Sequence, residues 1–159
     1  MDMCITGHRP DKLYGYNLND YRWRLLEEKI ADELIKNGCT RLYCGMALGV
    51  DTVAARACIR LKSEGYDIKL IACIPFKGQE SKWPYESRKM YYDLLSQCDE
   101  QVIVCDGGYA PYKMQERNRY MVDHSNLVLA VWDGSDGGTA NCVRYAQREK
   151  KQIINLYAA

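Results

Sequence analysis

Residues 127–150, LVLAVWDGSDGGTANCVRYAQREK, decide the fold class. The run 127–132 is apolar and as long as a buried strand, and the glycine-rich loop 133–138 follows it at once. Residues 139–149 then carry apolar side chains at helical spacing. A buried strand that passes through a short glycine loop into a helix is typical of one βα unit of a parallel sheet.

The same alternation continues on both sides of this unit. We expect strands at 3–6, 41–44, 68–74, 101–105, 127–132 and 152–156, and helices at 21–36, 50–62, 84–97, 114–124 and 139–149. Asn19 or Asp20 caps the first helix and Gly38 ends it. Because no linker or repeat interrupts the pattern, residues 1–159 are expected to form one Rossmann-like α/β domain. Its sheet should be mostly parallel, with helices on both faces.

Composition excludes several protein classes. The chain has 159 residues, of which 47% are hydrophobic and 27% charged, a mixture typical of a globular domain rather than of a disordered or fibrous protein. No apolar run approaches the roughly 18 residues that cross a bilayer, and residues 1–4 do not resemble a signal peptide. The formal net charge of +1 gives no reason to expect a nucleic-acid partner. We expect a cytoplasmic protein without membrane contact.

The eight cysteines do not form a recognisable metal or disulfide pattern. No Cys-x-x-Cys occurs, and neither His8 nor His124 stands at a zinc-like spacing from a cysteine. A chain of this length needs no disulfide bridges to fold. We therefore expect reduced thiols and no metal, with Cys4, Cys44, Cys73 and Cys105 acting as small core residues.

Open parallel sheets bind ligands beyond the carboxyl ends of their strands, so the loops there carry the candidate site. After the first strand, Gly7 permits close backbone approach and His8 and Arg9 suit an anion, although a plain turn with a solvated arginine would explain the same residues. After the second strand, the glycines of residues 45–49 could present backbone N–H groups to a phosphate. We expect Asp51 to cap the following helix rather than to contact a ribose or base.

The loop after the fifth strand is the strongest local signal. Gly134, Gly137 and Gly138 open a helix together with the hydroxyl of Thr139, which is how an anion cradle is built. The alternative is a flexible loop with Thr139 as a helix cap. No Gly-Lys-Ser/Thr follows, so the loop is not of the Walker A type.

Two further segments could close a pocket. Phe76, Gln79 and Trp83 could supply stacking and amide contacts. On the helix after the fourth strand, Arg117 and Arg119 diverge because they are two residues apart, so only one of them can face the strand ends. The neighbouring Met114 and Met121 are expected in the core.

Five motifs occur in order along nearly the whole chain: Thr6-Gly7-His8-Arg9-Pro10, Gly45-Met46-Ala47-Leu48-Gly49-Val50-Asp51, Pro75-Phe76 with Gln79 and Trp83, Arg117-Asn118-Arg119-Tyr120-Met121, and Trp132-Asp133-Gly134 with Gly137-Gly138-Thr139-Ala140-Asn141. Together they resemble the YpsA-like branch of the SLOG superfamily. The resemblance implies a Rossmann-like sheet related to the DNA-processing protein DprA and to the Lonely Guy phosphoribohydrolases. It also implies binding of a nucleotide or nucleotide-derived ligand.

The hydrolase branch is matched less well. Glu116-Arg117 resembles its Glu-Arg pair, with Arg117 at the catalytic arginine, but Cys142 stands where its Gly-Thr-x-x-Glu motif has the catalytic glutamate. A thiol cannot replace that acid at neutral pH without a change in chemistry. A nucleophilic role for Cys142 is the alternative, but no histidine lies near it in the sequence.

We therefore expect a protein that binds a nucleotide or nucleotide derivative at the strand ends, as a sensor or sequestering protein, with no required cofactor and in a monomeric or homo-oligomeric form. The alternative is a hydrolase of an N-glycosidic or phosphodiester bond that uses Asp51, Asp133 or Asp136 as general base. The sequence leaves open whether the chain is an enzyme. The candidate ligand-binding residues are Gly7, His8, Arg9, Gly45, Met46, Gly49, Asp51, Phe76, Gln79, Trp83, Arg117, Asn118, Asp133, Gly134, Gly137, Gly138, Thr139 and Asn141.

Overall fold

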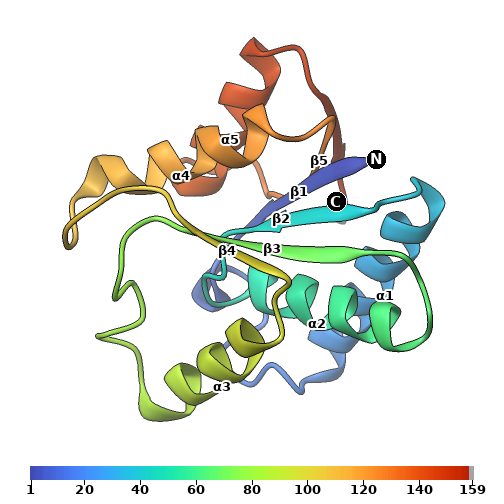
Figure 1. The fold of residues 1–159 in the computed structure, drawn as a ribbon, viewed down its shortest axis with the longest axis horizontal. Coiled ribbons are helices and arrows are strands. Elements are labelled where there is room, and N and C mark those ends of the chain that lie inside the picture. Colours follow the sequence, from blue (N-terminus) through green and yellow to red (C-terminus); the bar gives the residue numbers. More distant parts are fainter. Residues whose placement is uncertain (158–159) are drawn as a thin grey trace.

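A computed structural model describes residues 1–157, and within this range six strands form one sheet. The spatial order is β4-β3-β2-β1-β5-β6, and every neighbouring pair is parallel (Figure 1). The strands are β1 Asp2–Gly7, β2 Arg41–Cys44, β3 Lys69–Ile74, β4 Glu100–Ile103, β5 Leu127–Val131 and β6 Gln152–Asn155.

Helices cover both faces of the sheet. One face carries α1 (Tyr21–Lys36), α2 (Val50–Ser63) and α3 (Tyr85–Ser96), and the other carries α4 (Pro111–Asp123) and α5 (Gly138–Arg148) (Figure 1). A short 3-10 helix, Pro10–Lys12, follows β1. The expected Rossmann-like α/β architecture is confirmed.

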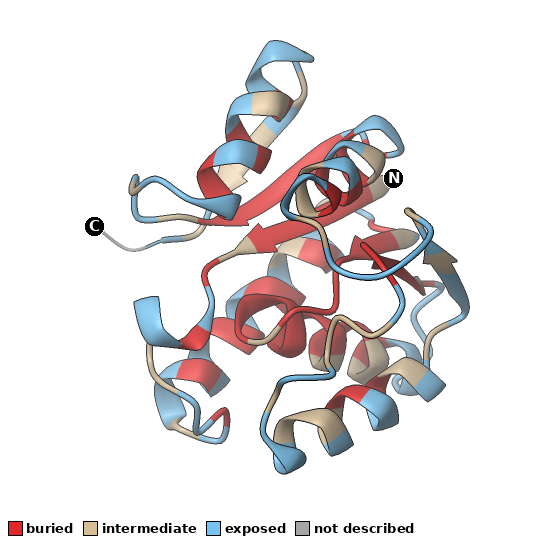
Figure 2. Cartoon of the chain, turned by 90° about the vertical axis from the view of Figure 1, so that its left-hand side faces the viewer, coloured by how far each residue is buried: buried red, intermediate tan, exposed pale blue. Residues whose placement is uncertain are grey.

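Alternate residues of the central strands enter two separate cores. Met3 and Ile5 of β1 and Leu129 of β5 pack with the α1–α3 side, whereas Cys4 and Val128 pack with α4 and α5. Both faces of these strands are therefore buried, as the red strands in Figure 2 show. This burial explains why the strands read as continuous apolar runs rather than as alternating ones.

The order of the strands creates a switch point between β1 and β5. From β1 the chain adds β2, β3 and β4 in one direction, and then it returns to place β5 on the other side of β1. The connections after β1 and β5 consequently lead to helices on opposite faces (Figure 1). A crevice forms at such a point beyond the carboxyl ends of the strands.

Most element boundaries agree with the sequence. Asp20 caps α1 by accepting the N–H of Arg22 at 2.9 Å, and Gly38 follows its last turn with φ of +63°. Two expectations need correction. β4 ends at Ile103 rather than at residue 105. α4 begins at Pro111 rather than at residue 114, because proline fits a first helical turn.

How deeply each cysteine is buried follows from these element boundaries. Cys4, Cys44 and Cys73 are fully buried, as expected for small core residues. Cys105 is only partly buried, because β4 ends two residues before it and leaves it in a loop.

Within residues 1–157, no helix combines the length and the apolar character needed to cross a bilayer.

Candidate functional site

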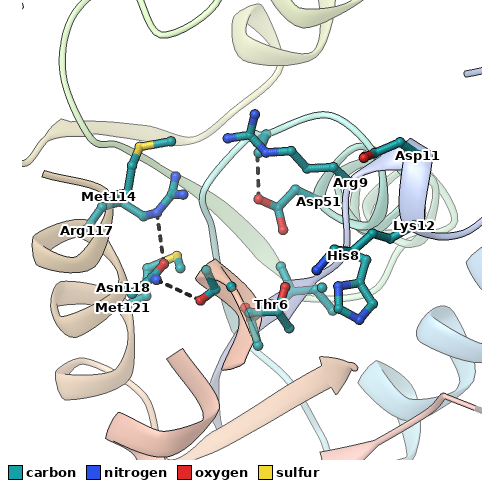
Figure 3. A pocket seen from close by; sticks show the side chains of 16 residues that line it. Thr6, His8, Arg9, Asp11, Lys12, Asp51, Met114, Arg117, Asn118 and Met121 are labelled. Atoms are coloured by element: carbon teal, nitrogen blue, oxygen red, sulfur yellow. Dashed lines mark hydrogen bonds between the residues drawn. The ribbon is translucent and has the colours of Figure 1, made fainter. Parts of the chain in front are cut away.

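A cavity of about 400 Å³ lies at the switch point, within the size range of small-molecule sites. Figure 3 shows Met114, Arg117 and Asn118 of α4 on one side and Arg9, Lys12 and Asp51 on the other. The complete lining is Ile5, Thr6, Gly7, His8, Arg9, Asp11, Lys12, Ala47, Asp51, Met114, Arg117, Asn118, Met121, Gly137, Gly138 and Thr139.

The end of β1 packs closely against α2. A Cβ on Gly7 would lie 2.5 Å from Val50, so this glycine allows the helix to approach the strand. His8 follows and is only 3% exposed. Its Nε2 lies 2.8 Å from Oδ1 and 3.0 Å from the backbone N of Asp133 in the β5–α5 loop. His8 thus joins the two loops that flank the switch point.

Asp133 has a structural part in this junction and lies outside the cavity lining. Hydrogen bonds from the hydroxyl (2.5 Å) and backbone N–H (2.9 Å) of Ser135, together with His8, lower the pKa of Asp133 to about 2. The carboxylate is therefore ionised at neutral pH, and it fixes His8 and the loop.

Lys12 brings a further cation to the cavity. The 3-10 turn that begins at Pro10 directs it back toward the strand ends. Its ammonium donates to Ser135 Oγ at 3.2 Å and to the Asp136 carbonyl at 3.0 Å. Lys12 was not among the residues singled out from the sequence. The only signal for it was a proline directly after Arg9, which suits the first turn of a helix.

Arg117 projects from α4 into the cavity and is only 6% exposed. Its Nη1 donates to the carbonyl of Gly45 at 2.8 Å and, more weakly, to that of Cys73 at 3.4 Å. Arg119 points away: it lies 3.8 Å from Glu116 and stacks over the Tyr145 ring. The side chains of Arg117 and Arg119 therefore point in different directions, as expected from their spacing.

Asp51 is the one buried carboxylate among the lining residues, at 7% exposure. It does not cap α2 as expected: Gly49 occupies the cap position, and Asp51 lies in the first turn. Its Oδ2 accepts the N–H of Ala47 at 3.1 Å. Burial raises the pKa of Asp51 above its usual value, while Arg117, the Ala47 N–H and Arg9 act in the opposite direction.

The amino end of α5 completes the cavity wall. Gly137 precedes the helix with φ of +139°, and Gly138 and Thr139 form its first turn. The first N–H groups of a helix have no acceptor within the helix and carry its positive end. Asn118 Nδ2 donates to the carbonyl of Gly138 at 3.4 Å and so connects α4 to this turn.

A family model for YpsA, described as the YspA SLOG family, matches residues 3–158. The chain belongs to this SLOG family. It is 37% identical over 131 residues to the SPbeta prophage-derived protein YoqJ of Bacillus subtilis, covering 75% of this chain and 77% of YoqJ.

Solved structures with the same fold include two DNA processing proteins. DprA from Streptococcus pneumoniae has a TM-score of 0.66 and 16% identity over 99% of this chain. This chain spans half of that protein. DprA from Helicobacter pylori, whose structure addresses its single-stranded DNA binding mode, has a TM-score of 0.63 and 20% identity. The match covers 96% of this chain and 63% of the Helicobacter protein.

In this SLOG chain Cys142 lies outside the cavity lining, in the core between the sheet and α5. Burial raises the pKa of its thiol to about 11, although a hydrogen bond with Thr6 acts in the opposite direction. The thiol is therefore protonated at neutral pH, which does not favour a nucleophilic role.

Half of the candidate residues lie outside the cavity lining, and several of them pack against other parts of the protein. A Cβ on Gly49 would lie 2.6 Å from the His8 carbonyl. Phe76 packs edge-on against Tyr109, and Trp83 against Tyr91. The residues outside the lining are Gly45, Met46, Gly49, Phe76, Gln79, Trp83, Asp133, Gly134 and Asn141.

Two methionines show how the core and the cavity meet. Met121 is buried in the α4–α5 core, as expected, and one side of it also borders the cavity. Met114 is only partly buried and lines the cavity, whereas it was expected in the core. It lies on the same side of α4 as Arg117, one turn closer to the start of the helix.

Proposed function

We propose that this SLOG protein binds a phosphate-bearing nucleotide or nucleotide derivative in the cavity between the ends of β1 and β5. The observation that carries the proposal is the meeting of Arg9, Lys12 and Arg117 with the amino end of α5 around one cavity. Cationic side chains and a helix amino end both favour an anion, and arginine can bind phosphate through two parallel hydrogen bonds.

The chemistry of the walls suggests an orientation for the ligand. Phosphate oxygens suit the amides of Gly138 and Thr139 and the ammonium of Lys12. Asp51 can accept hydrogen bonds from sugar hydroxyls or from an exocyclic amine. Met114 and Met121 supply an apolar surface for a ring.

The proposal is tested by thermal shift with mono-, di- and cyclic nucleotides and their ribose conjugates. A ligand at one hundred times its dissociation constant should stabilise the fold by about 2.7 kcal/mol. Mass spectrometry of small molecules that co-purify with the protein would identify a natural ligand. If no compound shifts the transition and nothing co-purifies, the proposal is wrong.

A hydrolase is the second candidate, and the buried carboxylate of Asp51 favours it. Asp133 lies outside the lining with a pKa of about 2, and Asp136 is 90% exposed and pairs with Arg144. Asp51 is thus the only one of the three proposed bases that lines the cavity. Chromatography of nucleotides after incubation with the protein would detect products, and Asp51→Asn should abolish them. Intact ligand throughout supports binding or sequestration instead.

A nucleic-acid ligand is a further outcome that the experiments should include. The Helicobacter DprA, which has the same fold, binds single-stranded DNA. The nearly balanced charge of this chain does not favour a nucleic-acid partner, so we favour a small ligand in the cytoplasm. Fluorescence polarisation with a labelled oligonucleotide, in competition with mononucleotides, separates the two. Tight oligonucleotide binding that mononucleotides cannot displace would overturn our choice.

A further inference from the structure

The carbonyl oxygen of Gly45, at the end of β2, accepts hydrogen bonds from two different parts of the chain. Arg117 Nη1 of α4 donates to it at 2.8 Å, and Gln79 Nε2 of the β3–α3 loop donates at 3.1 Å. Gln79 Nε2 also lies 3.4 Å from the hydroxyl of Tyr91 on α3. A hydrogen-bonded chain therefore runs across the strand ends from α3 to α4.

The same chain continues to the amino end of α5. Arg117 Nε donates to Asn118 Oδ1 at 3.3 Å, and Asn118 Nδ2 donates to the Gly138 carbonyl at 3.4 Å. One network thus connects both parts of the anion site that we propose, the guanidinium of Arg117 and the first turn of α5.

The fit of the guanidinium depends on the absence of a side chain at Gly45. A Cβ there would lie 2.3 Å from Arg117 Nη1 and 2.6 Å from Cζ. Gly45 does not have a positive φ, so an alanine there would be unfavourable for steric reasons and not because of backbone strain. The glycine is needed for the close approach of an arginine.

The hydrogen-bond partners of Arg117 are neutral groups that orient the guanidinium. Within residues 1–157 the hydrogen-bond acceptors of the guanidinium are two carbonyls and one amide, and the buried carboxylate of Asp51, whose pKa Arg117 lowers, lies near it without a hydrogen bond to it. Its Nη2 has no protein acceptor in the same range. A buried arginine held by neutral groups keeps its positive charge for a ligand.

We propose that Gly45 and Gln79 are positioning residues for Arg117, and that through this arginine they set the preference of the site for phosphate-bearing over uncharged ligands. The proposal rests on the function proposed above. Gly45 supplies space and one carbonyl, and Gln79 occupies the second acceptor position of that carbonyl and so fixes its direction.

The decisive experiment follows the Nε–H proton of Arg117 by NMR in the free protein. The signal is assigned with Arg117→Lys, which removes it, and its exchange with solvent is measured in Gly45→Ala and Gln79→Met. Gln79→Met removes one neutral hydrogen bond of the network, which predicts about 2- to 12-fold faster exchange. Gly45→Ala displaces a hydrogen bond of the charged guanidinium, which predicts about 10- to 150-fold faster exchange. Unchanged exchange in both variants would overturn the proposal. If Gly45→Ala does not fold, Gln79→Met alone decides.

Matched controls separate positioning from general loosening. Gly108→Ala adds a methyl group where nothing lies within 4 Å, and Gln97→Met removes an exposed amide that also donates to a carbonyl. Neither should change the exchange of the Arg117 proton. Faster exchange in the controls as well would contradict a specific role for Gly45 and Gln79.

A binding experiment then tests the consequence for ligands. Adenosine 5′-monophosphate and adenosine serve as charged and uncharged probes in titration calorimetry. In Gly45→Ala and Gln79→Met the affinity for the monophosphate should fall by about 2- to 12-fold, while any affinity for adenosine stays the same. Equal losses for both probes would contradict the preference. If the wild type binds neither probe, the proposed function fails for this nucleotide, while the exchange experiment still decides the positioning.

Discussion

Two glycine-rich loops flank the site, residues 45–49 after β2 and residues 133–138 after β5, and the sequence predicts a phosphate cradle in both. The first is filled from within the protein. Arg117 occupies the space beside Gly45, and the amides of Ala47 and Val50 donate to Asp51 and to the His8 carbonyl. These contacts do not support a phosphate cradle at residues 45–49.

The second loop is open. A Cβ on Gly134 or on Gly138 would meet nothing within 4 Å, and the first turn of α5 borders the cavity. The comparison teaches that a glycine after a parallel strand serves one of two close approaches, by a ligand or by another part of the chain. The glycines alone do not distinguish the two cases, because the difference lies in which distant side chain packs against them.

The largest effect should separate the two loops by stability. Gly49 and Gly134 both have positive φ, of +100° and +91°, so alanine strains either backbone by about 1–3 kcal/mol. At Gly49 the new Cβ also meets the His8 carbonyl at 2.6 Å, and overpacking adds about 1–3 kcal/mol. Urea unfolding should therefore show a greater loss for Gly49→Ala than for Gly134→Ala. Equal losses would mean that the first loop is not packed as described.

The next effect concerns ligand affinity. Arg117→Ala removes a charge-assisted hydrogen bond of about 1.5–3 kcal/mol, so the nucleotide with the largest thermal shift should bind roughly 10- to 150-fold more weakly. Arg119→Ala is the matched control, since its side chain faces solvent, and it should change affinity by less than about threefold. Titration calorimetry on both variants decides. A loss with Arg119→Ala alone would exclude Arg117 as the ligand-binding arginine.

The fold could be predicted from the sequence because its signals are local. The extent of α1, a cap at Asn19 or Asp20 and the burial of the central strands follow from apolar spacing and from residues beside each end, and the structure has the cap at Asp20. The spacing of Arg117 and Arg119 predicted that the two side chains diverge. That Arg117 is the one facing the strand ends followed only from the resemblance of Glu116-Arg117 to the Glu-Arg pair of the hydrolase branch.

The site could be predicted only in part, because the remaining contacts join residues far apart in sequence. Gln79 and Trp83 were expected at the cavity, but Gln79 donates to Gly45, 34 residues earlier, and Trp83 packs on Tyr91. Lys12 was missed because its partners lie more than 120 residues away in the β5–α5 loop. No local pattern indicates such pairs.

Lys12 provides the third test of the open loop. It is expected to contribute to ligand affinity and little to folding, since its partners Ser135 and Asp136 lie at the surface. Lys12→Ala should weaken nucleotide binding by about 2- to 12-fold and change the free energy of unfolding by no more than about 0.5 kcal/mol. Lys36→Ala, an exposed lysine at the end of α1, is the control. Unchanged affinity in Lys12→Ala would exclude Lys12 from the phosphate site.

The smallest effect is a difference in pH dependence at Asp51, which connects the filled loop to the cavity. Burial raises the pKa of Asp51 above its usual value of 3.8, so the folded chain retains this proton to a higher pH than the unfolded chain. As the pH rises from about 4 toward neutral, the unfolded state releases the proton first and the stability of the wild type falls. Asp51→Asn has no such proton, and its amide oxygen can still accept the N–H of Ala47. Urea unfolding between pH 4 and 7 should therefore show the wild type losing stability relative to the variant as the pH rises. The opposite slope would mean that the ionised carboxylate stabilises the first loop, and that Asp51 belongs to that loop's packing more than to the ligand site.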